Sequence, residues 1–244
     1  MTWPEVEAVI AQGAVAILPT GSTEQHGPMG LCGTDTLCAA HVARAVSQPG
    51  VVVAPVLAYT PAPFNTAFPG TVSVSVPVFE ALLTEVCTGL LAQGFLGIFV
   101  LNGHGANLAP ARKVAARMAP GAVHVQSWWD PAPVADLRRA LYGDWEGMHA
   151  TPSEVAITQA LFGAKPAGAA AMPPVPLTAE YIKAHAGDRH GPPEAHRAQF
   201  PDGRVGSHSA LATPQEGARI LEVASKAATR DVLTFLNARR AAAG

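Results

Sequence analysis

Four short apolar runs, separated by longer segments with helical periodicity, constrain the fold of this chain more than any other feature. The runs cover residues 14–19, 51–59, 96–102 and 122–128. Each is nearly continuous in aliphatic and aromatic residues, which is typical of strands that are buried on both faces. The sequence therefore predicts a central β-sheet that is covered on both sides.

The segments between these runs have helical patterns. One predicted helix has Thr34 as its N-cap. Another covers 77–94, with Pro77 in the first turn and Gly94 just past the end. A third follows the sequence NGHGAN and covers 108–119. Because parallel strands need a crossover connection, which is usually a helix, this alternation favours an α/β fold with a mainly parallel sheet.

The second half of the chain is less regular. A helix is predicted over 151–163, and residues 164–213 are rich in Pro, Gly and His, which indicates surface excursions. A long terminal helix is predicted over 213–240, where Thr213 and Glu216 have the spacing of a capping box.

Composition narrows the class of protein. The 244 residues are 49% apolar and only 14% charged, with a formal net charge of −2. Because there is no basic field, we expect no nucleic-acid partner. No apolar run reaches the roughly 18 residues of a membrane span, so we expect no membrane partner. The low charged fraction indicates that much of the surface is buried, with an interface between subunits as one alternative. We interpret residues 1–244 as a single domain of a cytoplasmic protein, since residues 1–13 lack the basic region of a signal peptide.

The three cysteines, Cys32, Cys38 and Cys87, are odd in number and form no CxxC pair, which argues against a disulfide framework. Cys38 and Cys87 lie in predicted helices and are interpreted as small core residues. For Cys32 two alternatives stay open: a structural cysteine, or a thiolate that binds metal or acts as a nucleophile.

Polar side chains follow two of the predicted strands. Glu24, His26 and Asp35 lie in the Gly-rich stretch after the first strand, and His104 follows the strand over 96–102. Glu24 and His26 are two residues apart, so an extended backbone directs both to one side. Ligands of open α/β sheets bind beyond the carboxyl ends of the strands. Imidazole and carboxylate are the ligands expected for Zn²⁺, Mn²⁺ or Fe²⁺.

Two further residues lie near the start of the predicted helix over 151–163. His149 lies just before it, and Glu154 lies in its first turn. Glu154 is a third acidic candidate ligand, and His149 is a candidate proton carrier because an imidazole titrates near neutral pH. For all of these candidate residues, a role that involves no metal ion also stays open. Carboxylates near helix starts are favoured by caps and the helix dipole, and His26 and His149 could be loop residues. The remaining histidines, 41, 124, 185, 190, 196 and 208, are interpreted as surface or core residues.

With these residues in hand, the chain resembles the creatininase family of amidohydrolases. The matching pieces are LPTGSTEQHGP with TDT, FPGTVSVS over 68–75, LNGHGAN, HATPSE over 149–154 and GRVGSHSALATPQEGARIL over 203–221. The resemblance implies a three-layer α/β/α sandwich and a homohexamer. It also implies a site with two divalent metal ions per chain, commonly Zn²⁺ or Mn²⁺, that hydrolyses cyclic amides, formamides or related C–N bonds.

By the same resemblance, Glu24, His26, Asp35 and His104 match metal ligands, with Asp35 as the bridge between the two ions. His149 matches the residue thought to move protons, and Glu154 the acidic residue five positions later.

Three positions depart from the family pattern. Met29 stands where a second His is common, Ala106 where creatininases proper have a metal-binding Glu, and ATPS where AGEI is more usual. We interpret Met29 as the position that separates this protein's substrate from creatinine, and Glu154 as the residue that completes the second metal site in place of residue 106.

The sequence therefore leads to one main hypothesis and two alternatives. The main one is a hydrolase of a small amide, in which metal-activated water attacks the carbonyl and His149 carries a proton to the departing nitrogen. Trp128, Trp129 and Trp145 are candidates for the pocket wall, with ordinary packing as the alternative. The protein could instead be a non-catalytic, metal-stabilised assembly or binding protein. A dinucleotide-binding domain has little support, because no GxGxxG follows the first strand.

Overall fold

The computed structural model describes residues 1–244 and contains a four-stranded, entirely parallel sheet in the order β2-β1-β3-β4. The strands are β1 (Val15–Thr20), β2 (Val51–Val53), β3 (Ile98–Asn102) and β4 (Val123–Ser127). The two central strands, β1 and β3, are buried along their whole length. The predicted parallel sheet is confirmed.

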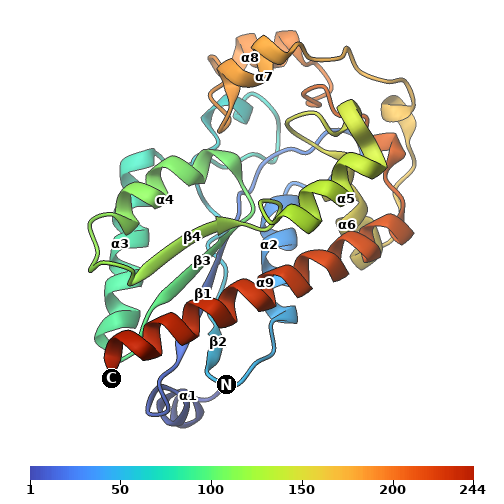
Figure 1. Cartoon of the computed structure of the whole chain (residues 1–244). Helices are drawn as coiled ribbons and strands as arrows, with labels where there is room; N and C mark the ends of the chain where they lie inside the picture. The colour runs from blue at the N-terminus through green and yellow to red at the C-terminus, as the bar shows by residue number, and fades with distance from the viewer.

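The chain also contains nine α-helices, most of which pack on the faces of the sheet (Figure 1). They are α1 (Trp3–Ile10), α2 (Thr34–Ala45), α3 (Val76–Ala92), α4 (Leu108–Ala115), α5 (Ala132–Tyr142), α6 (Pro152–Phe162), α7 (Ala179–His185), α8 (Pro193–Gln199) and α9 (Pro214–Ala243). None of them is both long enough and apolar enough to cross a membrane.

Successive side chains of the central strands enter two different cores. Val15 and Ile17 of β1 pack with residues of α2, α5, α6 and α9. Ala16 and Leu18 pack on the other face, with residues of α1, α3 and α4. This is the period-2 alternation of a strand with two apolar faces. The arrangement is the expected three-layer α/β/α sandwich.

The apolar run over 51–59 forms a shorter strand than predicted. Only Val51–Val53 is regular, and these residues are half-buried because β2 lies at the edge of the sheet. Pro55 has no N–H to give to the ladder. The chain still follows β1 beyond it, since the N–H of Leu57 donates to the carbonyl of Pro19.

Helix starts differ from the sequence predictions in two places. Gly33 is the N-cap of α2, and Thr34 is the first helical residue, with its hydroxyl bonded to the backbone of Leu31. The prediction of Thr34 as the cap was therefore wrong by one residue. The short helix α1 was missed, although Thr2 and Glu5 form a capping box at its start.

The excursion over 164–213 is more ordered than predicted. It contains α7 and α8, and these helices lie at the opposite end of the molecule from the two termini (Figure 1). Its two ends are joined by Arg204, which is buried, ion-pairs with Asp202 and donates to the carbonyls of Ala170 and Met172.

Candidate metal centre

The five predicted ligands converge at the carboxyl edge of the sheet. Glu24 and His26 lie in the loop after β1, His104 follows β3, Asp35 is in the first turn of α2, and Glu154 is in the first turn of α6. All five are at least nine-tenths buried. The crossovers of a parallel sheet bring these separate segments to one place.

Asp35 lies between two groups of side chains that could each hold a metal ion. Its Oδ2 is 3.1 Å from Nδ1 of His104, and that nitrogen is also 3.1 Å from Oε1 of Glu24. Its Oδ1 is 2.9 Å from Nε2 of His26, which is 3.9 Å from Oε2 of Glu154. The two oxygens of one carboxylate thus face two different imidazoles.

Glu154 combines two roles that the sequence left as alternatives. It completes a capping box with Thr151, whose N–H and hydroxyl both donate to Oε2 at 3.1 and 2.7 Å. The same carboxylate belongs to the group formed by His26 and Asp35. The cap fixes the orientation of Glu154 toward that group.

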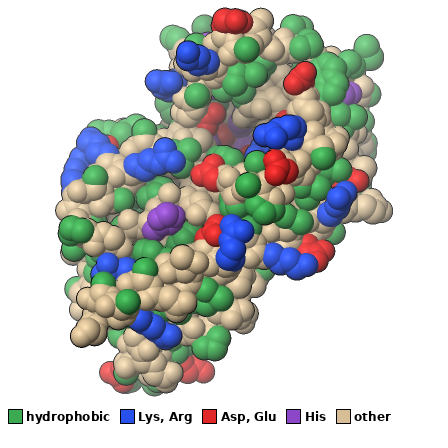
Figure 2. Space-filling view, in the orientation of Figure 1, with side chains coloured by type: hydrophobic (Ala, Val, Ile, Leu, Met, Phe, Trp, Pro, Cys, Tyr) green, Lys and Arg blue, Asp and Glu red, His purple; other side chains and the backbone are tan.

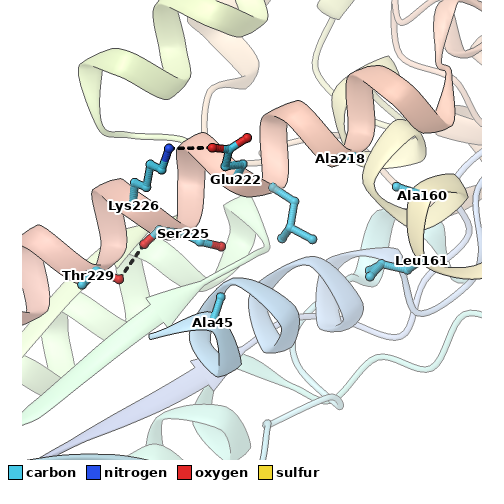
Figure 3. Close-up of a pocket in the computed structure, with 9 residues that line it drawn as sticks. Ala45, Ala160, Leu161, Ala218, Glu222, Ser225, Lys226 and Thr229 are labelled. Carbon is cyan, nitrogen blue, oxygen red and sulfur yellow. Dashed lines mark hydrogen bonds and ion pairs between the residues drawn. The ribbon is translucent and has the colours of Figure 1, made fainter. Parts of the chain in front are cut away.

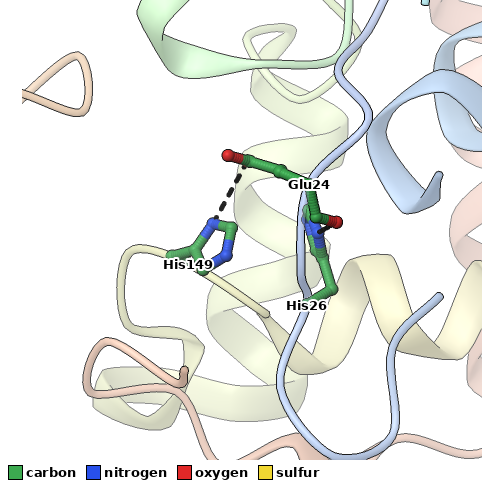
Figure 4. A group of neighbouring side chains, drawn as sticks. All are labelled: Glu24, His26 and His149. Carbon is green, nitrogen blue, oxygen red and sulfur yellow. Dashed lines mark hydrogen bonds and ion pairs between the residues drawn. The ribbon is translucent and has the colours of Figure 1, made fainter. Parts of the chain in front are cut away.

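His149 lies against the same cluster (Figure 4). Its ring centroid is 4.5 Å from that of His26, and its Nδ1 is 3.5 Å from Oε1 of Glu24. On the other side of the ring, Nε2 donates to the carbonyl of Gln25 at 2.7 Å. This hydrogen bond leaves the lone pair on Nδ1, toward the cluster.

Two further groups orient the cluster and were missed by sequence reasoning. Nε2 of His104 donates to the carbonyl of Pro61 at 2.9 Å, so its Nδ1 faces the carboxylates. The amide of Asn65 donates to Oε2 of Glu24 at 3.0 Å and is itself held by Gln25. Partners of this kind fix the orientation of metal-binding side chains. The sequence rule looked for His and acidic side chains after a strand, so it could not find a backbone carbonyl or an amide side chain.

The electrostatics of the cluster favour added positive charge. Burial disfavours the charged form of His26, but the nearby carboxylates, Asp35 foremost, outweigh it and raise the pKa to about 10. The pKa of His104 is likewise raised, against its burial, chiefly by Glu24. Burial raises the pKa of Glu154 to about 7. Burial and the charge of His26 lower the pKa of His149 to about 3, which keeps that imidazole neutral at pH 7.

The residues fit divalent metal ions. Oε1 of Glu24, Nε2 of His26 and Oδ2 of Asp35 are buried and make no hydrogen bond of good geometry, although each lies within 3.1 Å of another member of the cluster. Buried polar atoms without partners are costly, and a cation among them removes that cost. Carboxylate oxygens and imidazole nitrogens are also the donor set that Zn²⁺ and Mn²⁺ accept.

The cluster opens into a pocket of about 230 Å³, and acidic side chains gather around this hollow in Figure 2. Of the three candidate Trp residues only Trp129 lines it. Trp128 is buried in the core, and Trp145 packs edge-on against His208. Arg138 also lines the pocket, where its guanidinium is 2.7 Å from Oε1 of Glu146.

A larger hollow of about 570 Å³ lies elsewhere, between α9 and the ends of α2 and α6 (Figure 3). Ala45, Leu161 and Leu221 form much of its wall, and its two charged residues, Glu222 and Lys226, pair with each other. It has no converging ligands or unpartnered acids, so we place the functional site at the smaller pocket.

Two residues singled out by the sequence lie outside the cluster. Met29 is buried against Val155 and Ala156 of α6 and does not line the pocket, so it would not contact a substrate there. The turn that follows His26 directs it into the core. Cys32 is exposed and belongs to none of the ligand groups, so it is not placed as a metal ligand. Cys38 and Cys87 are buried as predicted.

The fold and these contacts define an α/β protein with a buried His–carboxylate centre at the carboxyl edge of its sheet, of the kind that binds divalent metal ions. A family-wide sequence profile described as creatinine amidohydrolase matches residues 1–232. The chain belongs to the creatininase family.

Individual relatives carry different activities. A creatinine amidohydrolase of Pseudomonas putida is 28% identical over 182 residues, which is 66% of this chain and 70% of that protein. A mycofactocin precursor peptide peptidase of Mycolicibacterium smegmatis is 38% identical over 131 residues, 50% of this chain and 51% of the relative. The chain thus spans about half the length of the peptidases it matches.

Solved structures support the fold. A creatininase structure matches with a TM-score of 0.67 and 24% identity, and the match covers 95% of this chain and 94% of that one. A structure described as creatininase Mn, and a mutant creatininase described as Zn-Zn type, match with TM-scores of 0.64 and 0.62. Both are 24% identical, with 95% of each chain covered.

Proposed function

We propose that this protein hydrolyses a C–N bond in a cyclic amide, a formamide or a related small amide, with two divalent metal ions bound per chain. Asp35 carries the proposal, because its two oxygens face two separate His–carboxylate groups. The Mn and Zn-Zn forms of similar creatininase structures support Zn²⁺ or Mn²⁺ as the ions, and Fe²⁺ suits the same donors.

Two of the three candidate ligand groups share Asp35, and the third consists of Glu24, His26 and His149. Glu24, Asp35 and His104 would hold one ion, and His26, Asp35 and Glu154 the other. Ions bound in this way supply hydroxide at neutral pH and polarise a carbonyl. Glu154 thus completes the second group, where Ala106 offers no ligand.

His149 would move the proton. Its Nε2–H is held by the carbonyl of Gln25, and its neutral Nδ1 faces the cluster beside Glu24. Because its pKa is lowered to about 3 by burial and the charge of His26, this imidazole would hold a proton at Nδ1 only briefly and pass it to the more basic departing nitrogen, a role that contributes about 10²–10⁴ in rate.

The pocket sets the size of the substrate. Its volume of about 230 Å³ is below the roughly 300–1,000 Å³ of sites for drug-sized ligands. A small ring, a formamide or the end of a peptide fits this size. Because some relatives are peptide peptidases, the end of a peptide remains one of the substrate classes to test.

The test is metal analysis followed by a screen of cyclic amides, formamides and short peptides. We expect two ions per chain and turnover of at least one substrate class. His104→Ala should lower bound metal and abolish turnover, whereas His124→Ala, on the exposed side of β4, should match the wild type. Full activity with retained metal in His104→Ala would refute the assignment.

The second candidate is a non-catalytic, metal-stabilised assembly or binding protein of the same family. A stoichiometry of one ion or none, without turnover of any substrate class, would favour it. We also propose, from the family resemblance, that residues 1–244 act as one domain in a homo-oligomer, which light scattering can measure.

A further inference from the structure

One acidic side chain of the pocket comes from outside every motif that resembles the family. Asp188 lies in the turn after α7, and only 10% of its side chain is exposed. Its Oδ2 lies 3.8 Å from Nδ1 of His104, the nitrogen that also faces Glu24 and Asp35. Its Oδ1 lies 3.8 Å from Nε2 of His190. Both distances are too long for hydrogen bonds, so the buried carboxylate lacks a close donor in these contacts.

The local backbone is built to bring this carboxylate to His104. Asp188 has a φ of 55°, in the left-handed region that few residues other than Gly adopt. A Cβ at Gly105 would overlap Oδ2 of Asp188. The close approach of Asp188 to His104 therefore depends on the left-handed backbone of Asp188 and on the absence of a side chain at Gly105.

The charges around the pocket indicate what Asp188 faces. Four carboxylates line it, those of Glu24, Asp35, Glu154 and Asp188. Arg138 also lines the pocket, but Glu146 offsets its charge. Carboxylates gathered in one largely buried pocket repel one another, and a cation among them removes that cost. The orphaned oxygens of Glu24 and Asp35, beside the same imidazole, place that cation next to His104.

We propose that Asp188 is a positioning residue for the metal ion held by Glu24, Asp35 and His104, and that its charge strengthens cation binding at that half of the centre. The inference rests on the metal-dependent function proposed above. Partners outside the ligand shell typically change metal affinity by about 10–100-fold, and we expect an effect of this size. Because Asp188 belongs to the excursion over 164–213, a bound ion also ties that excursion to the sheet edge.

Asp188→Asn is the direct test, since Asn tolerates the left-handed backbone and only the charge is removed. The matched control is Asp136→Asn on α5, whose side chain is 70% exposed. Binding of Mn²⁺ and of Zn²⁺ to the full chain would be measured by chelator competition. With either metal, we expect one of the two bound ions per chain to bind about 10–100-fold more weakly in Asp188→Asn. The affinity of the other position in this variant, and of both positions in the control, should equal that of the wild type.

Unchanged metal affinity at both positions in Asp188→Asn, or equal weakening at both positions, would overturn the inference about Asp188 but not the proposed function. A wild-type chain that binds neither ion would overturn the proposed function as well. Hydrogen exchange gives a readout independent of affinity. Amides of residues 185–191 should exchange more slowly when the wild type binds metal, and this protection should be smaller in Asp188→Asn at saturating metal.

Gly105→Ala tests the same contact from the other side. The added Cβ displaces the carboxylate of Asp188 and should weaken the same ion. Combined with Asp188→Asn it should cause no further loss, because both changes act through one contact. Losses that add in the double variant would contradict that contact.

Discussion

At the scale of single residues, the backbone decides which nitrogen of each imidazole is available. His104 and His149 both give Nε2 to a carbonyl, of Pro61 and Gln25 respectively, so Nδ1 of each faces the pocket. Nδ1 of His104 meets two carboxylates at 3.1 Å, whereas Nδ1 of His149 meets one at 3.5 Å. The two close carboxylates beside His104 suit a metal ligand. The single, longer contact of His149 suits a group that transfers a proton.

His149→Gln separates these two roles. We expect kcat to fall by about 10²–10⁴ while metal content stays at the wild-type level, because only proton transfer is lost. Turnover would be measured on the substrate found in the screen, and metal by elemental analysis. Loss of an ion would instead make His149 a ligand, since it lies within ligand distance of Glu24 and His26.

Metal binding should be linked to pH. In the metal-free protein the carboxylates near His26 raise its pKa, against its burial, to about 10, and burial raises the pKa of Glu154 to about 7. Both groups hold protons that a cation must displace, so metal affinity should rise as pH increases through about 7. Calorimetry in buffers with different ionisation enthalpies would detect the released protons. Binding without proton release at pH 6.5 would contradict these protonation states.

At the scale of elements, α6 and α9 pack closely behind the centre. Gly217, in the first turns of α9, lies so close to α6 that a Cβ there would overlap the carbonyl of Ala156. The same helix α6 carries Glu154 at its start. The long terminal helix thus supports the position of a proposed ligand without contacting the pocket.

Gly217→Ala should therefore destabilise the fold by roughly 1–3 kcal/mol, because the added methyl group forces the two helices apart. Gly89→Ala is the matched control, since it lies in α3 with open space around it. Removing a helical Gly there should stabilise by about 0.5–1 kcal/mol. Urea unfolding would measure both, and equal effects of the two changes would contradict the packing argument.

At the scale of the whole molecule, the centre joins segments that are distant in sequence. Its proposed ligands come from the loops after β1 and β3 and from the starts of α2 and α6. A cation shared by these segments binds the folded chain and not the unfolded one. Metal binding should therefore contribute directly to global stability.

Removal of metal should lower the melting temperature. At a free ion concentration of about 1,000 times Kd, binding stabilises the folded state by about 4 kcal/mol. A chain of this size changes its melting temperature by about 2–4 °C per kcal/mol. Thermal unfolding with and without a chelator measures the difference, and His104→Ala should show a smaller one. Equal melting temperatures after verified metal removal would contradict the shared-cation argument.

The sequence by itself determined the parallel sheet, most helices and the proposed ligands. Each of these depends on local patterns: continuous apolar runs, helical periodicity, and His or acidic residues just past a strand or at a helix start. Predictions from the sequence were incomplete where contacts with neighbouring segments decide the local structure. Edge position and Pro55 shortened β2, and the turn after His26 buried Met29.

Only the tertiary structure decided how the ligands pair and what surrounds them. The family resemblance already implied Asp35 as the bridge, but its contacts with His26 and His104, the hold of Asn65 on Glu24 and the approach of Asp188 to His104 are distances between segments far apart in the chain. No local pattern encodes such distances, because they follow from how the crossovers and a surface excursion meet at one edge of the sheet.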